Sequence, residues 1–130
     1  MGDIKVRLST LWIFVMFNMV FADIVGFLNP GTLEEMMAMK LPQEALLLFA
    51  ILLEIPIAMI VLSRLLKYKA NRWANIVAGI TTILWVIGGG NTSVSYIFFA
   101  TIEVASMALI IWSAWKWTEQ EAINNTRSAK

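Results

Sequence analysis

The chain has 130 residues, of which 59% are hydrophobic and 15% charged, whereas a soluble domain is about one quarter charged. It contains no cysteine and no histidine, which excludes disulfides, thiolate sites and the imidazole groups that most haem, zinc and acid–base sites use. A formal net charge of +1 gives no reason to expect a nucleic-acid partner. The composition therefore predicts the lipid bilayer as the main partner.

Four apolar segments follow one another along the chain. They cover residues 8–28, 45–66, 73–89 and 94–117, each near the roughly 20 residues that a helix needs to cross hydrocarbon. The apolar runs are continuous rather than alternating with period two, and only helices or closed barrels satisfy the backbone in lipid. The sequence predicts an all-α polytopic membrane protein, with a single domain over residues 1–130 and four transmembrane helices in an up-down bundle.

Two connections carry capping signals. A short helix is predicted outside the membrane at residues 32–40, where Thr32 and Glu35 have the spacing of a capping box. Its apolar side is predicted either to lie on the membrane surface or to cap the bundle. Between the second and third spans, "KYKANRWAN" predicts a tight basic turn in which Asn71 caps the third span.

Charges set the predicted orientation. Nine of the ten basic residues lie before the first span, from the end of the second to the start of the third, or at and beyond the end of the fourth, and only Lys40 lies on the other side. Because cytoplasmic loops carry the excess of Lys and Arg, both termini and the tail at 118–130 are predicted in the cytoplasm, with the spans crossing the cell (inner) membrane. Four indole rings are predicted at the same interface, which such rings prefer: Trp12, Trp73, Trp115 and Trp117.

Three acidic residues interrupt the spans. At a rise of about 1.5 Å per residue, Asp23 lies roughly 7 Å below the outer end of its span, and Glu54 and Glu103 lie roughly 13 Å below theirs. No Lys or Arg occurs at that depth, and an ionised carboxylate in hydrocarbon costs at least about 2.5 kcal/mol. Their side chains are therefore predicted to point into the bundle, an oligomer interface or a wet cavity.

Small residues accompany each acid at helical spacing, as they do where helices approach closely. The rows are Ala50, Glu54 and Ala58; Ala100, Glu103 and Ser106; and Asn18, Ala22 and Gly26 beside Asp23. The candidate proton, cation or substrate site consists of Glu54, Glu103, Asp23 and Asn18. The alternative is that each acid is protonated and donates a hydrogen bond that holds neighbouring helices together. No catalytic residue, metal ligand or cofactor is predicted.

Five stretches resemble a family of small prokaryotic four-helix membrane proteins that is known only as a domain of unknown function and is distantly similar to DoxX-like proteins. They are "LSTLWIFVMFN", "ADIVGFLNPG", "LLEIPIAMIVLSR", "ANRWANI" and "YIFFATIEVASMALIIWSAW". The resemblance spans residues 8–117 and implies the four-helix architecture. It also implies that the surroundings of Glu54 and Glu103, together with Arg64 and "ANRWAN", belong to the family pattern, but it brings no activity.

Two functions remain open at this level. The first is a small carrier or channel for protons, a cation or a cationic compound, acting as a homo-oligomer because four short helices enclose little volume. The second is a non-transporting subunit, assembly factor or anchor of a membrane complex, as the DoxX-like resemblance suggests. An enzyme is not expected, because no nucleophile or metal constellation accompanies the acids.

Overall fold

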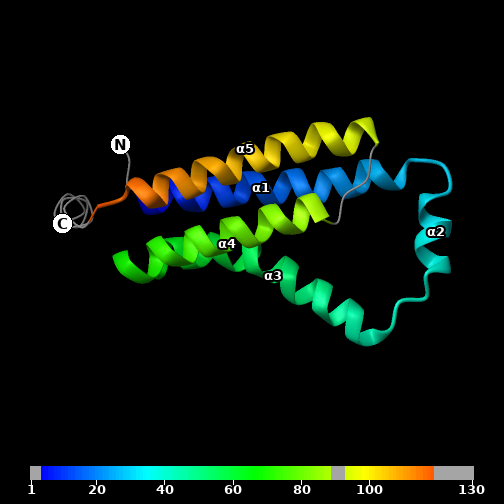
Figure 1. Ribbon diagram of the computed structural model, residues 1–130, viewed down its shortest axis with the longest axis horizontal. Helices are drawn as coiled ribbons and strands as arrows, with labels where there is room; N and C mark the ends of the chain where they lie inside the picture. The colour runs from blue at the N-terminus through cyan, green and yellow to red at the C-terminus, as the bar shows by residue number, and fades with distance from the viewer. Residues whose placement is uncertain (1–3, 89–92, 119–130) are drawn as a thin grey trace.

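The computed structural model describes residues 4–88 and 93–118, and these residues form helices and short connections only. The helices are α1 (Ile4–Phe27), α2 (Thr32–Ala38), α3 (Gln43–Leu65), α4 (Tyr68–Gly88) and α5 (Val94–Lys116) (Figure 1). The all-α prediction is confirmed for this part of the chain. Of the predicted tail, residues 119–130 lie outside the described residues.

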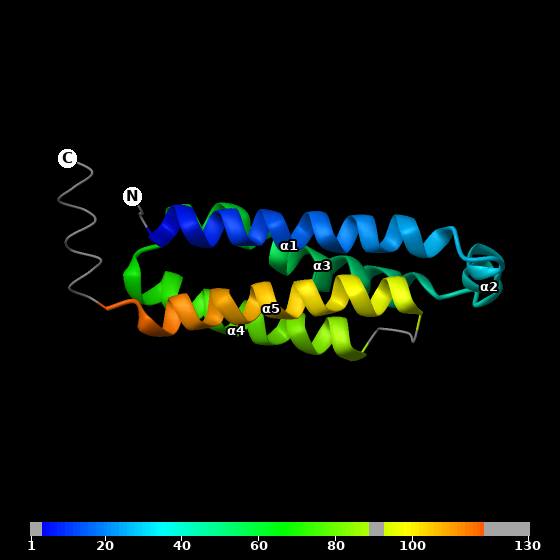
Figure 2. The ribbon, with the colours of Figure 1, turned by 90° about the horizontal axis from the view of Figure 1, so that it is seen from above.

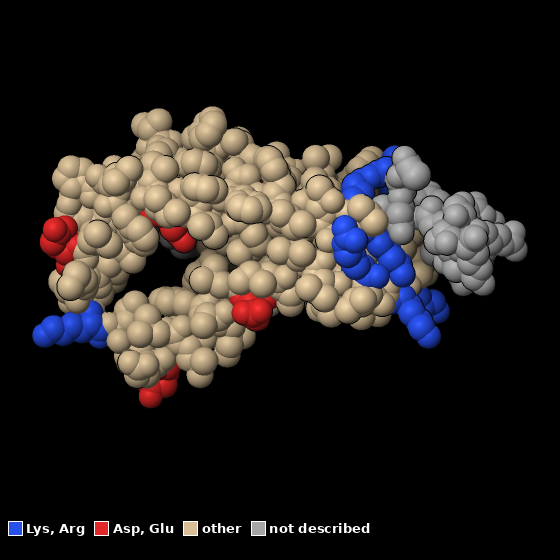
Figure 3. All heavy atoms as spheres, turned by 180° about the vertical axis from the view of Figure 1, so that it is seen from behind, with Lys and Arg blue, Asp and Glu red and all other residues tan. Residues whose placement is uncertain are grey.

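Four long helices pack in a ring, with α2 across one end. Helices α1 and α4 each pack against both α3 and α5, and successive long helices run in opposite directions (Figures 1 and 2). The basic end, where the described basic side chains other than Lys40 gather, is opposite the α2 end (Figure 3). The core includes Leu8, Trp12, Met107 and Ile110, while many large apolar side chains face outward, as suits a bundle surrounded by lipid.

Three helices among the described residues, α1, α3 and α5, are long and apolar enough to cross a membrane. Helix α4 is not one of them, because its first two turns carry Lys69, Asn71, Arg72 and Asn75. The described residues thus contain four long helices, and the crossing of α4 remains a prediction.

Asn71 caps a different helix from the one predicted. Helix α4 begins at Tyr68, five residues before the predicted span, so Asn71 lies inside it. The Asn71 Nδ2 atom donates to the carbonyls of Ser63, at 2.7 Å, and Leu66, at 3.1 Å. These carbonyls end α3 and lack partners within their own helix. The predicted N-cap is therefore wrong, and the amide instead closes the C-terminus of α3.

The predicted capping box at the start of α2 is also wrong. Gly31, with a φ of 84°, is the N-cap, and no side chain caps the helix. The left-handed conformation of Gly31 makes Thr32 the first helical residue, one position too late to cap. The Glu35 N–H donates to the Gly31 carbonyl at 2.9 Å instead.

Indole rings divide between core and surface. Trp73 and Trp115 are exposed, as an interfacial position requires, but Trp12 and Trp117 are buried. The Trp12 Nε1 atom donates to Asn75 Oδ1 at 2.8 Å. Trp12 and Trp117 thus lie inside the bundle rather than on its surface, and their depth relative to the membrane stays a prediction. For Trp12 the reason for the burial is that a buried amide on α4 offers its N–H a partner that water would otherwise supply.

Buried amides and hydroxyls bind α1, α3 and α4 together near the basic end. The Ser63 Oγ atom also donates to Asn75 Oδ1, at 3.2 Å, and Asn75 Nδ2 donates to the Asn71 carbonyl, at 2.9 Å. Ser9 Oγ donates to the Ile60 carbonyl at 2.8 Å. The polar groups are thus used for packing at the basic end, and the intramembrane acids lie toward the other.

Candidate functional site

Glu103 lies on the face of α5 that packs into the bundle. Its side chain is only 3% exposed, and the residues that follow on the same face, Ser106, Met107 and Ile110, are buried as well. The inward direction predicted from the row of small residues is therefore confirmed for Glu103. Within residues 4–88 and 93–118, nothing donates a hydrogen bond to its carboxyl group and no basic side chain pairs with it.

Asp23 is the acidic neighbour of Glu103. It lies on α1, which packs against α5, and the negative charges of the two side chains repel each other. The Asp23 side chain is exposed, so it borders the interior rather than filling it. We call Asp23 and Glu103 the acid pair. Two acidic side chains close enough to interact, with no basic partner among the described residues, favour uptake of a proton or a cation near them.

Tyr96 stands beside the acid pair and was missed at the level of sequence. Both acidic charges act on its phenol group, and its hydroxyl donates to the Val86 carbonyl near the end of α4. The spacing could have revealed it, because Tyr96 precedes Glu103 by seven residues, which places both on one face of a helix. Ser93 starts this helix, its Oγ accepting the Tyr96 N–H at 3.3 Å.

Asn18 does not join the acid pair. Its Nδ2 atom donates to the Phe14 carbonyl of its own helix, at 2.9 Å. Five residues separate Asn18 from Asp23, or about 140° around an α-helix. The amide therefore lies on a different side of α1.

Glu54 faces away from the bundle. The buried residues of α3 are Pro56, Met59 and Ser63, and at about 100° per residue Glu54 lies roughly opposite this face. Its side chain is exposed. Of the destinations predicted for this acid, the interior of its own bundle is therefore wrong, because Pro56, Met59 and Ser63, rather than the row through Ala50 and Ala58, form the inward face of α3.

A bend in α3 opens the α2 end of the bundle. Pro56 lies inside the helix, and its ring removes the N–H that would bond the carbonyl four residues earlier. The part of α3 before the bend diverges from α1 and α5 (Figure 1), and Figure 3 shows a hollow there with acidic atoms at its rim. Phe49 still reaches Trp85 on α4, with ring centroids 5.5 Å apart.

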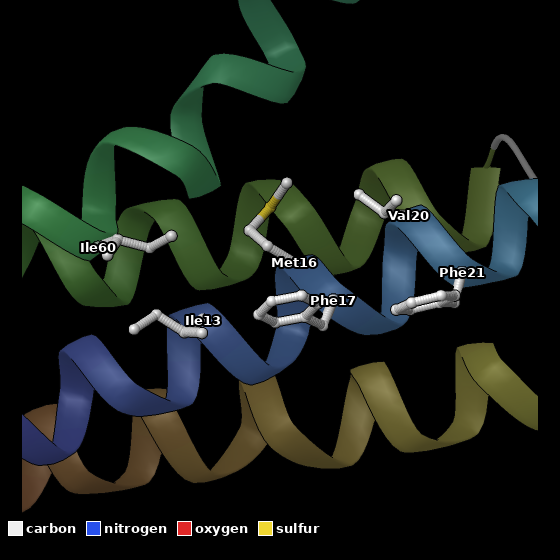
Figure 4. A pocket seen from close by; sticks show the side chains of 6 residues that line it. All are labelled: Ile13, Met16, Phe17, Val20, Phe21 and Ile60. Carbon is white, nitrogen blue, oxygen red and sulfur yellow. The ribbon is translucent and has the colours of Figure 1, made fainter.

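An apolar groove lies between α1 and α3, with a volume of about 290 Å³. Figure 4 shows its side chains, which carry no oxygen or nitrogen atom. They are Ile13, Met16, Phe17, Val20, Phe21 and Ile60. Sequence reasoning missed this groove, because apolar residues in a membrane span carry no mark that separates a groove from an ordinary lipid-facing surface.

The chain belongs to a family whose function is unknown. A family model described as "Family of unknown function (DUF6326)" matches residues 2–124. The comparisons found no match among curated proteins or solved structures. The resemblance to a family of unknown function is thus confirmed, and no activity comes with it.

Proposed function

We propose that the protein is an integral membrane carrier or channel that moves protons or small cations through the acid pair. The observation that carries the proposal is Glu103, which is 3% exposed, has a second acid as its neighbour and lacks any described basic partner. A buried charge must be paired or neutralised. The site satisfies this requirement by taking up a proton or a cation, which are the species that the protein would carry.

In the proposed arrangement α4 crosses the membrane as the third of four spans, and both termini are cytoplasmic. The gathering of basic side chains at one end supports this orientation (Figure 3), because Lys and Arg mark the cytoplasmic side. The acid pair then lies in the outer half of the cell membrane, and the hollow at the α2 end gives ions a path from outside.

Glu54 supports a homo-oligomer. In a single chain its exposed carboxyl group would meet acyl chains, at a cost of at least about 2.5 kcal/mol when ionised. A second copy packed on the same face of α3 would cover Glu54, with Ala50 and Ala58 allowing close approach. Since the chain has no cysteine, Ala58→Cys should form disulfide-linked dimers in native membranes, while Val77→Cys on α4 should not. Equal cross-linking of the two variants would contradict this interface.

Flux through reconstituted protein tests the proposed function. Purified protein would be placed in vesicles that contain a pH-sensitive dye, and a potassium diffusion potential would drive protons inward. We expect wild-type protein to acidify the vesicles, and Glu103→Gln or Asp23→Asn to reduce the rate to that of empty vesicles. Glu44→Gln, which alters an exposed acid in the first turn of α3, is the matched control and should retain flux.

Two results would overturn the proposal: the absence of proton and cation flux from wild-type protein, or wild-type flux in the Asp23→Asn/Glu103→Gln double variant. The first would favour the alternative of a non-transporting subunit, assembly factor or anchor, for which the exposed Glu54 offers a contact to a different membrane protein. Affinity purification from native membranes should then recover a stoichiometric partner.

A further inference from the structure

The apolar groove between α1 and α3 is aligned with the acid pair. Met16 and Val20 line the groove, and Asp23 follows them at positions i+7 and i+3, respectively, so the three residues form one stripe along α1. From Val20 to Asp23 the helix rises roughly 4.5 Å. The groove therefore leads along α1 from a wholly apolar surface to a carboxylate.

We propose that this groove and the acid pair form one binding site for an amphiphilic cation, such as an alkylammonium compound. The positively charged head would lie between Asp23 and Glu103, and the alkyl tail would lie along Met16 and Val20. This assignment rests on the proposed function of the acid pair and names the class of compound that it carries.

The order of groove and acids matches the way an amphiphile lies in one leaflet. Ile13, at one end of the groove, is near the middle of α1, whereas Asp23 lies close to the α2 end. A head group at Asp23 therefore points toward the membrane surface and the tail toward the bilayer centre. Phe17 and Val20 are 61% and 48% exposed, so the groove is open sideways and the compound can reach it directly from the lipid.

Charge and size select this occupant over others. A phospholipid would bring an anionic phosphate toward two carboxylates, which repel it. A volume of about 290 Å³ is at the lower end of the range for small-molecule sites, which suits one alkyl chain. A single alkyl chain with a cationic head satisfies both the apolar lining and the unpaired acids. When the dissociation constant is expressed with the concentration of the compound in water, each additional buried methylene group should lower it roughly fourfold.

Binding of radiolabelled octyltrimethylammonium to the protein in lipid nanodiscs tests the inference. Empty nanodiscs give the background, tetramethylammonium has the same head without the tail, and octyl sulfonate has the same tail with a negative head. We expect saturable binding of octyltrimethylammonium that octyl sulfonate does not displace and that tetramethylammonium displaces only weakly. Glu103→Gln and Asp23→Asn should each abolish this binding.

Two tryptophan variants locate the tail. Val20→Trp fills the groove and should abolish saturable binding, whereas Leu109→Trp, on the exposed side of α5, should leave it unchanged. Binding that survives Val20→Trp, or equal binding of octyl sulfonate, would indicate ordinary lipid-like association and overturn the inference. If octyltrimethylammonium did not bind, but wild-type protein still carried a proton flux that Glu103→Gln abolished, only this inference would be refuted and the proposed function would stand. Wild-type flux in the double acid variant would refute the proposed function.

Discussion

Replacing Asn75 by leucine should destabilise the bundle more than a single lost hydrogen bond would. The Asn75 Oδ1 atom accepts from Trp12 Nε1 and Ser63 Oγ, at 2.8 and 3.2 Å. All three side chains are fully buried. Leucine is close to asparagine in size but cannot accept a hydrogen bond, so Asn75→Leu leaves two buried donors without a partner.

The expected loss follows from these two donors. A buried donor left unsatisfied costs about 1–3 kcal/mol, while hydrogen bonds inside membrane bundles average only about 0.6 kcal/mol because the unfolded chain also finds partners. We therefore expect Asn75→Leu to lower the free energy of unfolding by about 2–4 kcal/mol. Thr101→Val is the control, because its hydroxyl is exposed and bonds only the Ile97 carbonyl of its own helix. It should change stability by less than about 0.5 kcal/mol.

Reversible unfolding in mixed micelles of a mild detergent and dodecyl sulfate, followed by far-ultraviolet circular dichroism, measures this loss. Adding Trp12→Phe completes a double-mutant cycle, and the coupling to Asn75 should be about 1 kcal/mol. If Asn75→Leu were as stable as Thr101→Val and the cycle were additive, the buried amides would not hold α1 and α3 to α4.

Further expectations concern packing and orientation. A Cβ atom at Gly79 would lie 2.8 Å from Ile111 Cγ1, so Gly79→Leu should force α4 away from α5 and cost about 1–3 kcal/mol in the same unfolding assay. Gly88→Leu, with open space around the site, should have little effect, and equal losses would contradict close packing at Gly79. In intact cells, Met37→Cys in α2 should react with a membrane-impermeant maleimide, and Lys67→Cys should react only after the membrane is opened; the reverse pattern would invert the proposed topology.

The positions of the helices could be predicted from the sequence, because the thickness of the bilayer sets the length of the apolar segment that a membrane-spanning helix needs. The start of α4 could not be predicted, because Lys69 and Asn71 have the composition of a loop. Asn71 remains helical since its amide finds the free carbonyls of Ser63 and Leu66. These carbonyls belong to the preceding helix, eight and five residues before Asn71. The sequence around Asn71 does not show that they are free to accept its amide.

The direction of Glu103 could be predicted, but that of Glu54 could not. Both acids have small residues at helical spacing, and this pattern indicates a close helix contact without saying whether the contact lies within one chain or between copies. In lipid, large apolar residues suit both the core and the outside, so they do not reveal which side of α3 faces inward. Burial of Pro56 and Met59 decides the direction only after the chain is folded.

Infrared difference spectroscopy of the reconstituted protein tests the central claim, that the acid pair takes up a proton or a cation, most directly. We expect acidification to produce a protonated-carboxyl absorption that octyltrimethylammonium removes, and we expect Glu103→Gln to eliminate this cation-sensitive component while Glu44→Gln retains it. An identical cation-sensitive absorption in Glu103→Gln and wild-type protein would contradict the claim.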